Sequence, residues 1–295
     1  MSILIDKNTK VLVQGITGRE ASEKVPEMLD YGTEILAGVT PGKGGENVEG
    51  VPVYDTVEEA LEDYPDINAS LVYVPHFAAK DAAFEALESG IPLLNIVTER
   101  VPVKDAWQIY RKAQNTGARV VGPTSVGIIS PGKSKLGPIG GKDTEKVYQQ
   151  GHIGLMSKSG GMTTETAHVL GQSGLGISTA LGLGGDRIAS TNFKDCLKLF
   201  EKDSQTDAVV MFGELGGRYE LEAARYIEEE FSKPVVAFIA GEFTESLPSQ
   251  QYGHAGAIIR ENEESPSYKK KVLKDSGAHV VDVHHEISDV LEEIL

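Results

Sequence analysis

Short apolar segments that alternate with helical patterns are the feature that most constrains the fold of this chain. Alternation of this kind predicts a parallel sheet that is covered by helices on both faces. In the first half we expect strands at Lys10–Gln14, Glu34–Val39, Ser70–Val74, Leu93–Thr98 and Arg119–Gly122. The helices expected between them are Thr56–Asp63, Ala78–Ser89 and Lys104–Thr116.

A second series follows the stretch from Pro123 to about Gln150, which is rich in glycine, proline, serine and lysine and which we interpret as a loop. Since 295 residues are enough for two cores, we predict two tandem doubly wound α/β domains, residues 1–125 and 126–295. The expected strands of the second are His152–Met156, Ile177–Leu183, Asp207–Phe212, Pro234–Ile239 and His279–Val283. Its expected helices are Met162–Gln172, Phe193–Glu201, Glu220–Glu230 and Glu286–Ile294.

Charge and cysteine content narrow the possible partners and the compartment. The formal net charge of −16 argues against nucleic acid and anionic membranes, because both require a basic face. The chain has no apolar run of membrane-spanning length and no signal pattern at its N-terminus. The single cysteine, Cys196, lies in an amphipathic run, so we expect its side chain to be buried. A chain with one cysteine forms no internal disulfide, which suits a reducing compartment. These observations predict a cytoplasmic protein.

A glycine turn follows the first expected strand. The segment Gly15–Ala21 reads Gly-Ile-Thr-Gly-Arg-Glu-Ala and resembles a dinucleotide-binding turn, in which helix N–H groups face an anion. After the second expected strand, Lys43 stands among glycines where an acidic residue would bind an unmodified ribose. A cation there suits the phosphorylated ribose of coenzyme A or NADP, although a flexible loop with a solvated lysine fits the same pattern.

The segment Gly127–Ser134 has the letters of a phosphate-binding Walker A loop. That motif requires a helix directly after the lysine. The residues that follow, Lys135–Gly141, contain a proline and three glycines, and such a sequence does not begin a stable helix. We therefore reject a nucleotide site in this segment.

The second half carries the residues suited to group transfer. His254 lies between Gly253 and Ala255-Gly256 without a metal-ligand partner at close spacing, so we expect an accessible nucleophile and no metal site. Small residues and hydroxyls at Ser157–Gly161 precede an expected helix, as phosphate sites require. Glu214, in a glycine turn after a strand, is the carboxylate that we expect to orient the imidazole. A surface histidine and a solvated turn acid are the alternatives.

These segments in this order resemble the α subunits of succinyl-CoA synthetases over essentially the whole chain. The resemblance implies a Rossmann-like CoA-binding domain followed by a flavodoxin-like ligase domain. It implies that His254 is phosphorylated and that Glu214 orients or stabilises it. It implies that Ser157, Ser159 and Gly160 hold the phosphate, and that the CoA site lies along Thr17, Gly18, Arg19, Glu20, Lys43, Val97, Thr98 and Glu99. To the phosphate and substrate site we add Gly161, Thr164 and Arg187, which the resemblance itself does not assign.

The resemblance also implies a mechanism and a partner. A nucleoside triphosphate phosphorylates the histidine, the phosphoryl group passes to a carboxylate, and the CoA thiol displaces phosphate. ATP or GTP with Mg²⁺ is bound mainly by an ATP-grasp β subunit, so we expect a hetero-oligomer, αβ or α₂β₂, and an acid–thiol ligase that requires both subunits. The acid is a dicarboxylate or a tricarboxylate.

Four segments depart from the succinyl pattern and look more like ATP-citrate lyase and citryl-CoA synthetase. They are Pro123–Gly127, Ser159–Glu165 with Thr164 in place of a tyrosine, Gly184–Arg187 with Arg187 in place of a proline, and Leu247–Tyr252. Succinate is the expected substrate, and citrate or a related acid is the alternative, because a guanidinium matches an additional carboxylate. Arg187 as a plain surface charge fits equally well. An NADP-dependent oxidoreductase and a non-catalytic CoA-responsive regulator are the remaining alternatives.

Overall fold

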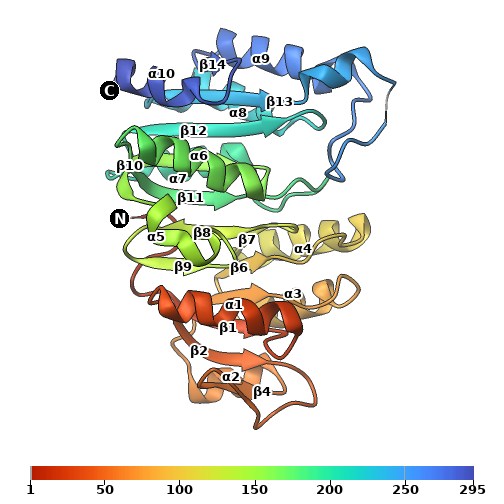
Figure 1. The fold of residues 1–295 in the computed structure, drawn as a ribbon. Coiled ribbons are helices and arrows are strands. Elements are labelled where there is room, and N and C mark those ends of the chain that lie inside the picture. Colours follow the sequence, from red (N-terminus) through yellow and green to blue (C-terminus); the bar gives the residue numbers. More distant parts are fainter. Residues whose placement is uncertain (1, 249) are drawn as a thin grey trace.

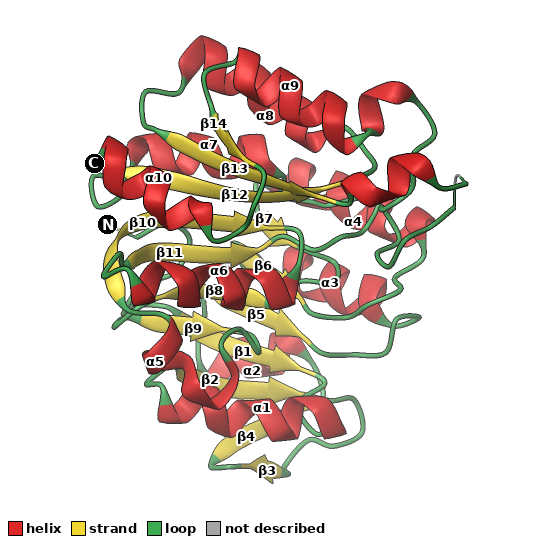
Figure 2. Cartoon of the chain, turned by 45° about the horizontal axis from the view of Figure 1, so that its top comes forward, coloured by secondary structure: helices red, strands yellow, loops and turns green. Residues whose placement is uncertain are grey.

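A computed structural model describes residues 2–248 and 250–295. Met1 and Ser249, the latter within the divergent segment Leu247–Tyr252, lie outside the described residues. The chain forms two sheets that follow one another along the sequence, with helices on both faces of each (Figures 1 and 2). The predicted class, two tandem α/β domains, is confirmed. No helix in the described residues is both long and apolar enough to cross a membrane.

The first sheet has the strand order β3-β4-β2-β1-β5-β6-β7. All its pairs are parallel except the short β3–β4 pair, and without β3 the order is that of a dinucleotide-binding fold. Its strands are β1 (Lys10–Gln14), β2 (Glu34–Val39), β3 (Asn47–Val48), β4 (Val51–Tyr54), β5 (Ala69–Val72), β6 (Leu93–Ile96) and β7 (Arg119–Val121), and its helices are α1 (Arg19–Asp30), α2 (Val57–Asp63), α3 (Ala79–Glu88) and α4 (Val103–Thr116).

The second sheet has the order β14-β13-β12-β10-β11-β8-β9. Its five parallel strands follow the flavodoxin order, and β8 joins them antiparallel at one side. The strands are β8 (Gly127–Ser130), β9 (Ser134–Leu136), β10 (Gln150–Ser157), β11 (Ile177–Gly182), β12 (Ala208–Glu214), β13 (Val235–Ala240) and β14 (His279–Val281). The helices are η1 (Gly141–Asp143), α5 (Thr144–Val147), α6 (Gly160–Gln172), α7 (Phe193–Lys202), α8 (Tyr219–Glu230), η2 (Glu242–Ser246), η3 (Asn262–Glu264), α9 (Pro266–Asp275) and α10 (Glu286–Ile294).

The interpretation of Pro123 to Gln150 as a loop was wrong. This stretch contains the β8–β9 hairpin, η1 and α5. The hairpin confirms the rejection of the Walker A loop, because the lysine of that motif, Lys133, lies in its turn and donates to Gln205 Oε1 at 2.6 Å. Two strands of three and four residues are too short for a reliable period in the sequence. Their stability comes from pairing, β8 with β11 and β9 with β8.

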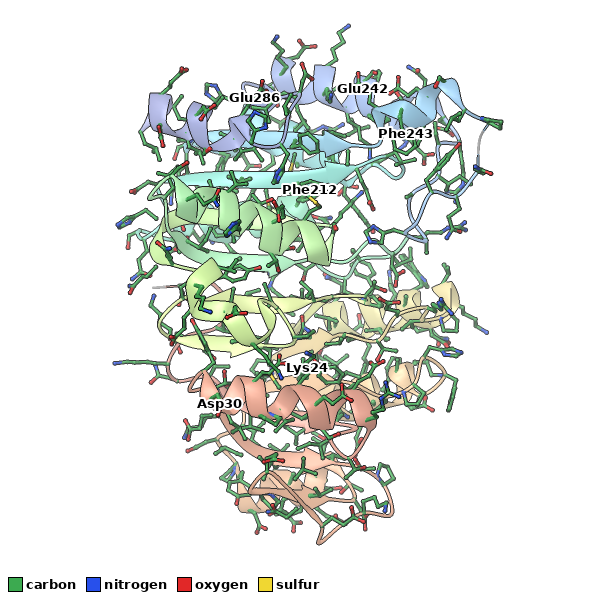
Figure 3. All side chains as sticks on the ribbon, viewed as in Figure 1. Lys24, Asp30, Phe212, Glu242, Phe243 and Glu286 are labelled. Atoms are coloured by element: carbon green, nitrogen blue, oxygen red, sulfur yellow. The ribbon has the colours of Figure 1, made fainter. Side chains whose placement is uncertain are left out.

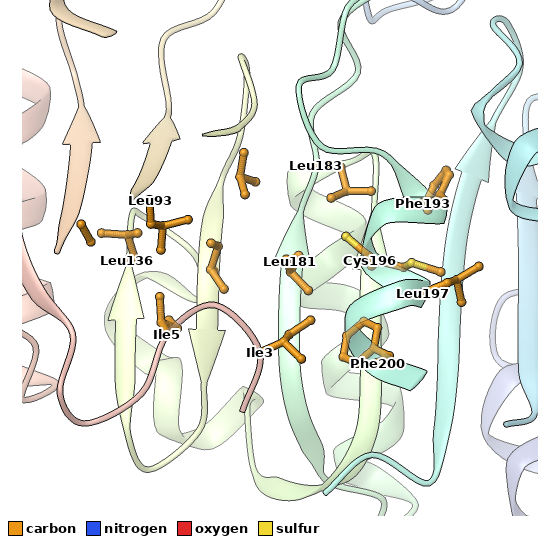
Figure 4. Packing of buried hydrophobic residues seen from close by; sticks show 14 of the residues in the cluster. Ile3, Ile5, Leu93, Leu136, Leu181, Leu183, Phe193, Cys196, Leu197 and Phe200 are labelled. Carbon is orange, nitrogen blue, oxygen red and sulfur yellow. The ribbon is translucent and has the colours of Figure 1, made fainter. Parts of the chain in front are cut away.

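The same hairpin joins the two domains. The Thr33 hydroxyl, at the start of β2, donates to Lys135 O at 2.7 Å and accepts from Lys135 N at 3.1 Å. The Gly132 N–H donates to the hydroxyl of Tyr31 at 3.0 Å. Apolar packing continues across this junction, from Ile3, Ile5, Leu93 and Leu136 to Leu181, Phe193, Cys196 and Phe200 (Figure 4).

Cys196 is fully buried in this cluster, as its amphipathic run predicts, and burial raises the pKa of its thiol. The cluster shows that the two sheets share one continuous apolar region. Their parallel strands point to the same side of the molecule (Figures 1 and 2), so the loops after the strands of both sheets lie along one edge. That edge carries the residues considered next.

Candidate active site

A cavity of about 580 Å³ opens where the strands of the first sheet end. Its lining includes the turn that begins α1 and the segment that follows β6. The N-cap of α1 is Gly18, and a glycine has no side chain that could cap the helix. The unpaired N–H groups of this helix end therefore face a space where an anionic group can bind. Six predicted CoA residues lie together here: Gly18, Arg19, Glu20, Val97, Thr98 and Glu99.

Two other predicted CoA residues lie on neighbouring loops. The Thr17 N–H donates to the hydroxyl of Thr40 at 3.4 Å, which links the turns after β1 and β2. Lys43 lies on the exposed loop after β2, outside the cavity lining, and its Nζ is 2.8 Å from Glu46 Oε1. The Asp55 carboxylate accepts from Gly44 N–H at 2.9 Å and fixes this loop.

His254 and Glu214 form the central pair of the second domain. The Nδ1 atom of His254 lies 2.8 Å from Glu214 Oε2, with 33% of the imidazole and 10% of the carboxylate exposed. The carboxylate raises the pKa of His254 above the ordinary value of 6.5, although burial opposes this effect. With Nδ1–H donating to Glu214, the Nε2 lone pair is free to act as a nucleophile.

The loop that carries His254 is tied to the turn after β11. The Gly256 N–H donates to Gly185 O at 2.8 Å, and Arg187 Nε donates to Ala255 O at 3.1 Å. The imidazole of His254 fills the space that a β-carbon at Gly185 would need. The glycine at this position therefore permits the close approach, and Arg187 contacts the histidine loop.

Aromatic residues brace the segment that leads to this loop. Phe243, in η2 after β13, is 67% exposed and lies at the outer end of the second domain (Figure 3). Its ring meets that of Tyr252 edge-on, with centroids 6.1 Å apart. The two rings hold the beginning and the end of the segment together.

The N-terminus of α6 lies at the same edge of the sheet. Ser157 pairs with Gly182 of β11 and with Phe212 of β12, so the loops after these strands are neighbours. Ser157 Oγ accepts from Ser159 N–H at 3.0 Å, and Ser159 Oγ caps the helix by accepting from Met162 N–H at 3.3 Å. These bonds order the turn. The helix α6 begins beside it at Gly160, and the N–H groups of Gly160 and Gly161 belong to its first turn.

Thr164 lies on the second turn of α6. Its hydroxyl is 3.2 Å from the hydroxyl of Tyr148, which is buried at the end of α5. A tyrosine hydroxyl thus reaches the position of Thr164 from another segment. The sequence showed that Thr164 stands where the succinyl pattern has a tyrosine, but it did not show the contact with Tyr148.

Asp186 lies at this edge, within the divergent segment Gly184–Arg187, and the sequence alone assigns it no role. Its carboxylate accepts from the hydroxyl of Thr124 at 3.0 Å. Burial raises the pKa of Asp186 above its ordinary value, although this hydrogen bond and the charge of His254 oppose the effect. An acidic residue inside a glycine turn after a strand was the available signal. Tyr73 lines the cavity of the first domain, and the sequence by itself did not single it out. Its position at the end of a strand was the only feature in the sequence that could have indicated it.

Comparison with known proteins agrees with the two-domain organisation. The CoA-binding domain model matches residues 6–100, and the CoA-ligase model matches residues 156–285. The alpha subunit of ADP-forming succinate–CoA ligase from Staphylococcus epidermidis is 47% identical over 291 residues, which cover 99% of this chain and 94% of that protein. Alpha subunit 2 of the same ligase from Archaeoglobus fulgidus is 46% identical over 297 residues, and the match covers 100% of this chain and 100% of that protein.

Among solved structures, ATP citrate lyase from Methanothrix soehngenii, in complex with citrate and coenzyme A, superposes with a TM-score of 0.90. The sequence identity is 27%, and the match covers 99% of this chain. It covers 51% of the lyase chain, so this chain spans about half of that protein.

Proposed function

The chain belongs to the family of succinate–CoA ligase alpha subunits, and from this premise we propose that His254 carries phosphate between a nucleotide and succinate in the formation of succinyl-CoA. The observation that carries the proposal is the His254–Glu214 pair, 2.8 Å apart, at the sheet edge where α6 begins. A nucleophile and an anion-binding helix end are the two requirements of phosphoryl transfer.

The reaction begins with the neutral imidazole. The Nδ1–H group of His254 donates a hydrogen bond to Glu214 and keeps its proton, while Nε2 attacks the terminal phosphorus of the nucleoside triphosphate and the nucleoside diphosphate leaves. As the N–P bond forms, the ring becomes cationic, and the Glu214 carboxylate stabilises that charge. The N–H groups at Gly160 and Gly161 and the hydroxyls of Ser157 and Ser159 are the groups that we assign to the phosphate.

The remaining steps regenerate the histidine. A carboxylate oxygen of succinate attacks phosphorus, the N–P bond breaks, and neutral His254 returns. The sulfur of CoA, as the thiolate, then attacks the acyl carbon, and inorganic phosphate leaves. Thr164 and Arg187 are the residues that we assign to the acid, Arg187 through the histidine loop that it contacts.

The cavity of the first domain suits CoA. Its volume of about 580 Å³ accommodates part of a ligand of this size, and the α1 N-terminus supplies N–H donors for its phosphates. The residues that we assign to CoA are those of the cavity together with Thr17 and Lys43, the latter for the 3′-phosphate. We set the boundary between the CoA-binding and ligase domains at residues 125 and 126.

The nucleotide and Mg²⁺ belong to a β subunit with an ATP-grasp fold in this proposal, in an αβ or α₂β₂ assembly in the cytoplasm. The relatives named above are ADP-forming, and we propose ATP as the nucleotide. Citrate is the second candidate acid, because Arg187 and Thr164 follow the citrate-lyase pattern and this chain superposes closely on about half of the lyase chain.

The test is acyl-CoA formation by the chain co-expressed with its β subunit, with ATP, CoA and either succinate or citrate. We expect turnover with succinate, and none in His254→Asn. Turnover with citrate alone would make this a citryl-CoA synthetase subunit. Acid-labile phosphate should appear on wild type incubated with labelled ATP and be absent from the variant. Equal labelling of wild type and variant would exclude His254 as the phosphorylated residue. In a separate thermal-unfolding measurement, stabilisation of the chain by NADP and not by CoA would favour the oxidoreductase.

A further inference from the structure

Three charged side chains lie buried beneath the turn that carries Glu214. We call Lys158, Glu220 and Lys269 the charge triad; they come from the turn between β10 and α6, from α8 and from α9. Glu220 contacts both lysines, through Oε1 to Lys158 Nζ and through Oε2 to Lys269 Nζ, each at 2.7 Å. Glu220 and Lys269 are fully buried and Lys158 is 7% exposed.

Stability alone is a poor explanation for this arrangement. Removing three charges from water carries a large desolvation penalty, and apolar residues of similar size often stabilise a core equally well or better. Two lysines and one glutamate also leave one net positive charge in the interior. Burial would raise the pKa of Glu220, but the two lysines hold it below its usual value, so the carboxylate stays charged.

The hydrogen bonds of Lys269 show what the charge triad holds. Its ammonium donates to Glu214 O at 2.8 Å, to Gly216 O at 2.6 Å and to Glu220 Oε2. These bonds use all three N–H groups of the side chain. The Glu214 N–H donates to Glu220 Oε1 at 3.3 Å, so the backbone of Glu214 is bound to the charge triad on both sides. Its side chain, on the other side of the turn, bonds His254.

We propose that Lys269, together with Glu220, is a positioning residue for phosphoryl transfer at His254. By fixing both backbone polar groups of Glu214, the two residues set the direction of its carboxylate. The carboxylate in turn decides which nitrogen of His254 carries the proton and which attacks phosphorus. The inference rests on the proposed function of His254, and it extends the active site to α9, about fifteen residues further along the chain from that histidine.

The test is Lys269→Met in the complex with the β subunit. Methionine keeps the length of the side chain and leaves Lys158 and Glu220 as a neutral pair. The rate of His254 phosphorylation by labelled ATP, without CoA or succinate, is measured across pH. The charged groups that act on His254 are Glu214, Asp186 and Lys158, and all three are retained in the variant. We expect a rate about tenfold to a hundredfold lower. The pH midpoint should also fall, since a misdirected Glu214 no longer raises the pKa of His254.

Lys233→Met is the matched control. Lys233 precedes β13, at the opposite edge of the sheet, and its ammonium donates to Phe200 O and Asp203 O at 2.6 Å each. This variant also loses bonds to two carbonyls, so it should lower the unfolding temperature while keeping the wild-type pH midpoint. If Lys269→Met behaves like this control, with an unchanged midpoint and rate, the proposal is overturned.

If Lys269→Met does not fold, a double variant provides a second test of the proposal. Glu220→Gln combined with Lys269→Met keeps one positive charge in the cluster, on Lys158, and should show the same fall in pH midpoint. An unchanged midpoint in the folded double variant would equally overturn the proposal. Wild-type labelling separates the two hypotheses: an unlabelled wild type contradicts the proposed function, whereas a labelled wild type leaves the variants to decide the role of Lys269.

Discussion

The imidazole of His254 occupies the space that a side chain at Gly185 would fill. The two residues are far apart in the sequence, and the hydrogen bond from Gly256 N–H to Gly185 O holds the two loops in contact. The absence of a β-carbon at Gly185 is therefore a condition for the orientation of the histidine toward Glu214.

Gly185→Ala should displace the imidazole and reduce phosphorylation of His254 about a hundredfold, because transfer depends on sub-ångström placement of the nucleophile. The measurement is the single-turnover rate of labelling by ATP in the complex with the β subunit. Gly171→Ala in α6 is the control, since a β-carbon there meets only ordinary contacts. The control should label normally and gain about 0.5–1 kcal/mol of stability. Normal labelling of Gly185→Ala would contradict the steric argument.

Glu214→Gln keeps an acceptor for Nδ1–H but removes the negative charge. Only the neutral imidazole attacks, so the wild-type rate should rise with pH through the pKa of His254, which Glu214 holds above 6.5. In the variant that pKa falls, so the midpoint of the profile should move to lower pH, while the maximal rate drops about tenfold because the cationic ring is less stabilised. Glu222→Gln on α8, whose carboxylate bonds Asn192, should leave the midpoint unchanged. A midpoint that Glu214→Gln does not move would remove Glu214 as the source of the shift.

Lys43→Ala tests the assignment of this lysine to the ribose phosphate. Because Lys43 is exposed and already paired with Glu46, we expect CoA binding to weaken only about threefold to fivefold. Calorimetric titration with CoA and with 3′-dephospho-CoA gives the comparison, and the second ligand should bind wild type and variant equally. Lys142→Ala, at an exposed position in η1, is the control. An equal loss for both ligands would place Lys43 away from the 3′-phosphate.

Arg187→Ala separates two roles of this residue. Its Nε bonds Ala255 O, so loss of the side chain should loosen the histidine loop and slow labelling of His254 several-fold, about 1 kcal/mol in barrier, even without any acid present. A variant that labels normally but has a higher KM for the acid would instead show that the guanidinium acts on the substrate.

Lys135→Met tests a buried charge at the domain junction. Lys135 is fully buried, and burial lowers its pKa to about 8. At pH 7 the variant avoids desolvating an ammonium group but loses the Nζ hydrogen bonds to Gly141 O at 2.8 Å and to Thr144 Oγ1 at 3.0 Å. We expect the desolvation effect to be larger, so that the variant is more stable by about 1 kcal/mol. As pH rises from 8 toward 10.5, the folded wild type releases a proton that the unfolded chain retains, so its stability rises and the difference narrows.

Thermal unfolding from pH 7 to 10 measures this difference. Lys133→Met, in the same hairpin but bonded to Gln205, should show no such narrowing. A constant gap between Lys135→Met and wild type would mean that Lys135 does not titrate in this range.

Much of the fold was predictable because the parallel strands are buried on both faces. Such strands appear as continuous apolar runs, and β1 and β2 were predicted with the bounds that the structure shows. The glycine turns after β1, β10, β11 and β12 followed, since parallel strands place their carboxyl ends at one edge. The β8–β9 hairpin escaped because its strands are short and its pairing partner, β11, lies about fifty residues further along the chain.

The sequence by itself determined the residue types that chemistry requires: a histidine between glycines, a carboxylate in a glycine turn, and hydroxyls at the start of a helix. Local spacing specifies such groups because each belongs to one turn. Only the tertiary structure decided which of them meet. It brought Glu214 to Nδ1 of His254, Arg187 to the histidine loop and Lys269 beneath Glu214, contacts between segments that no local period relates. The reason is physical: long-range pairing is set by the packing of whole elements, and a buried lysine such as Lys269 has, in the sequence, the appearance of any exposed lysine on a helix.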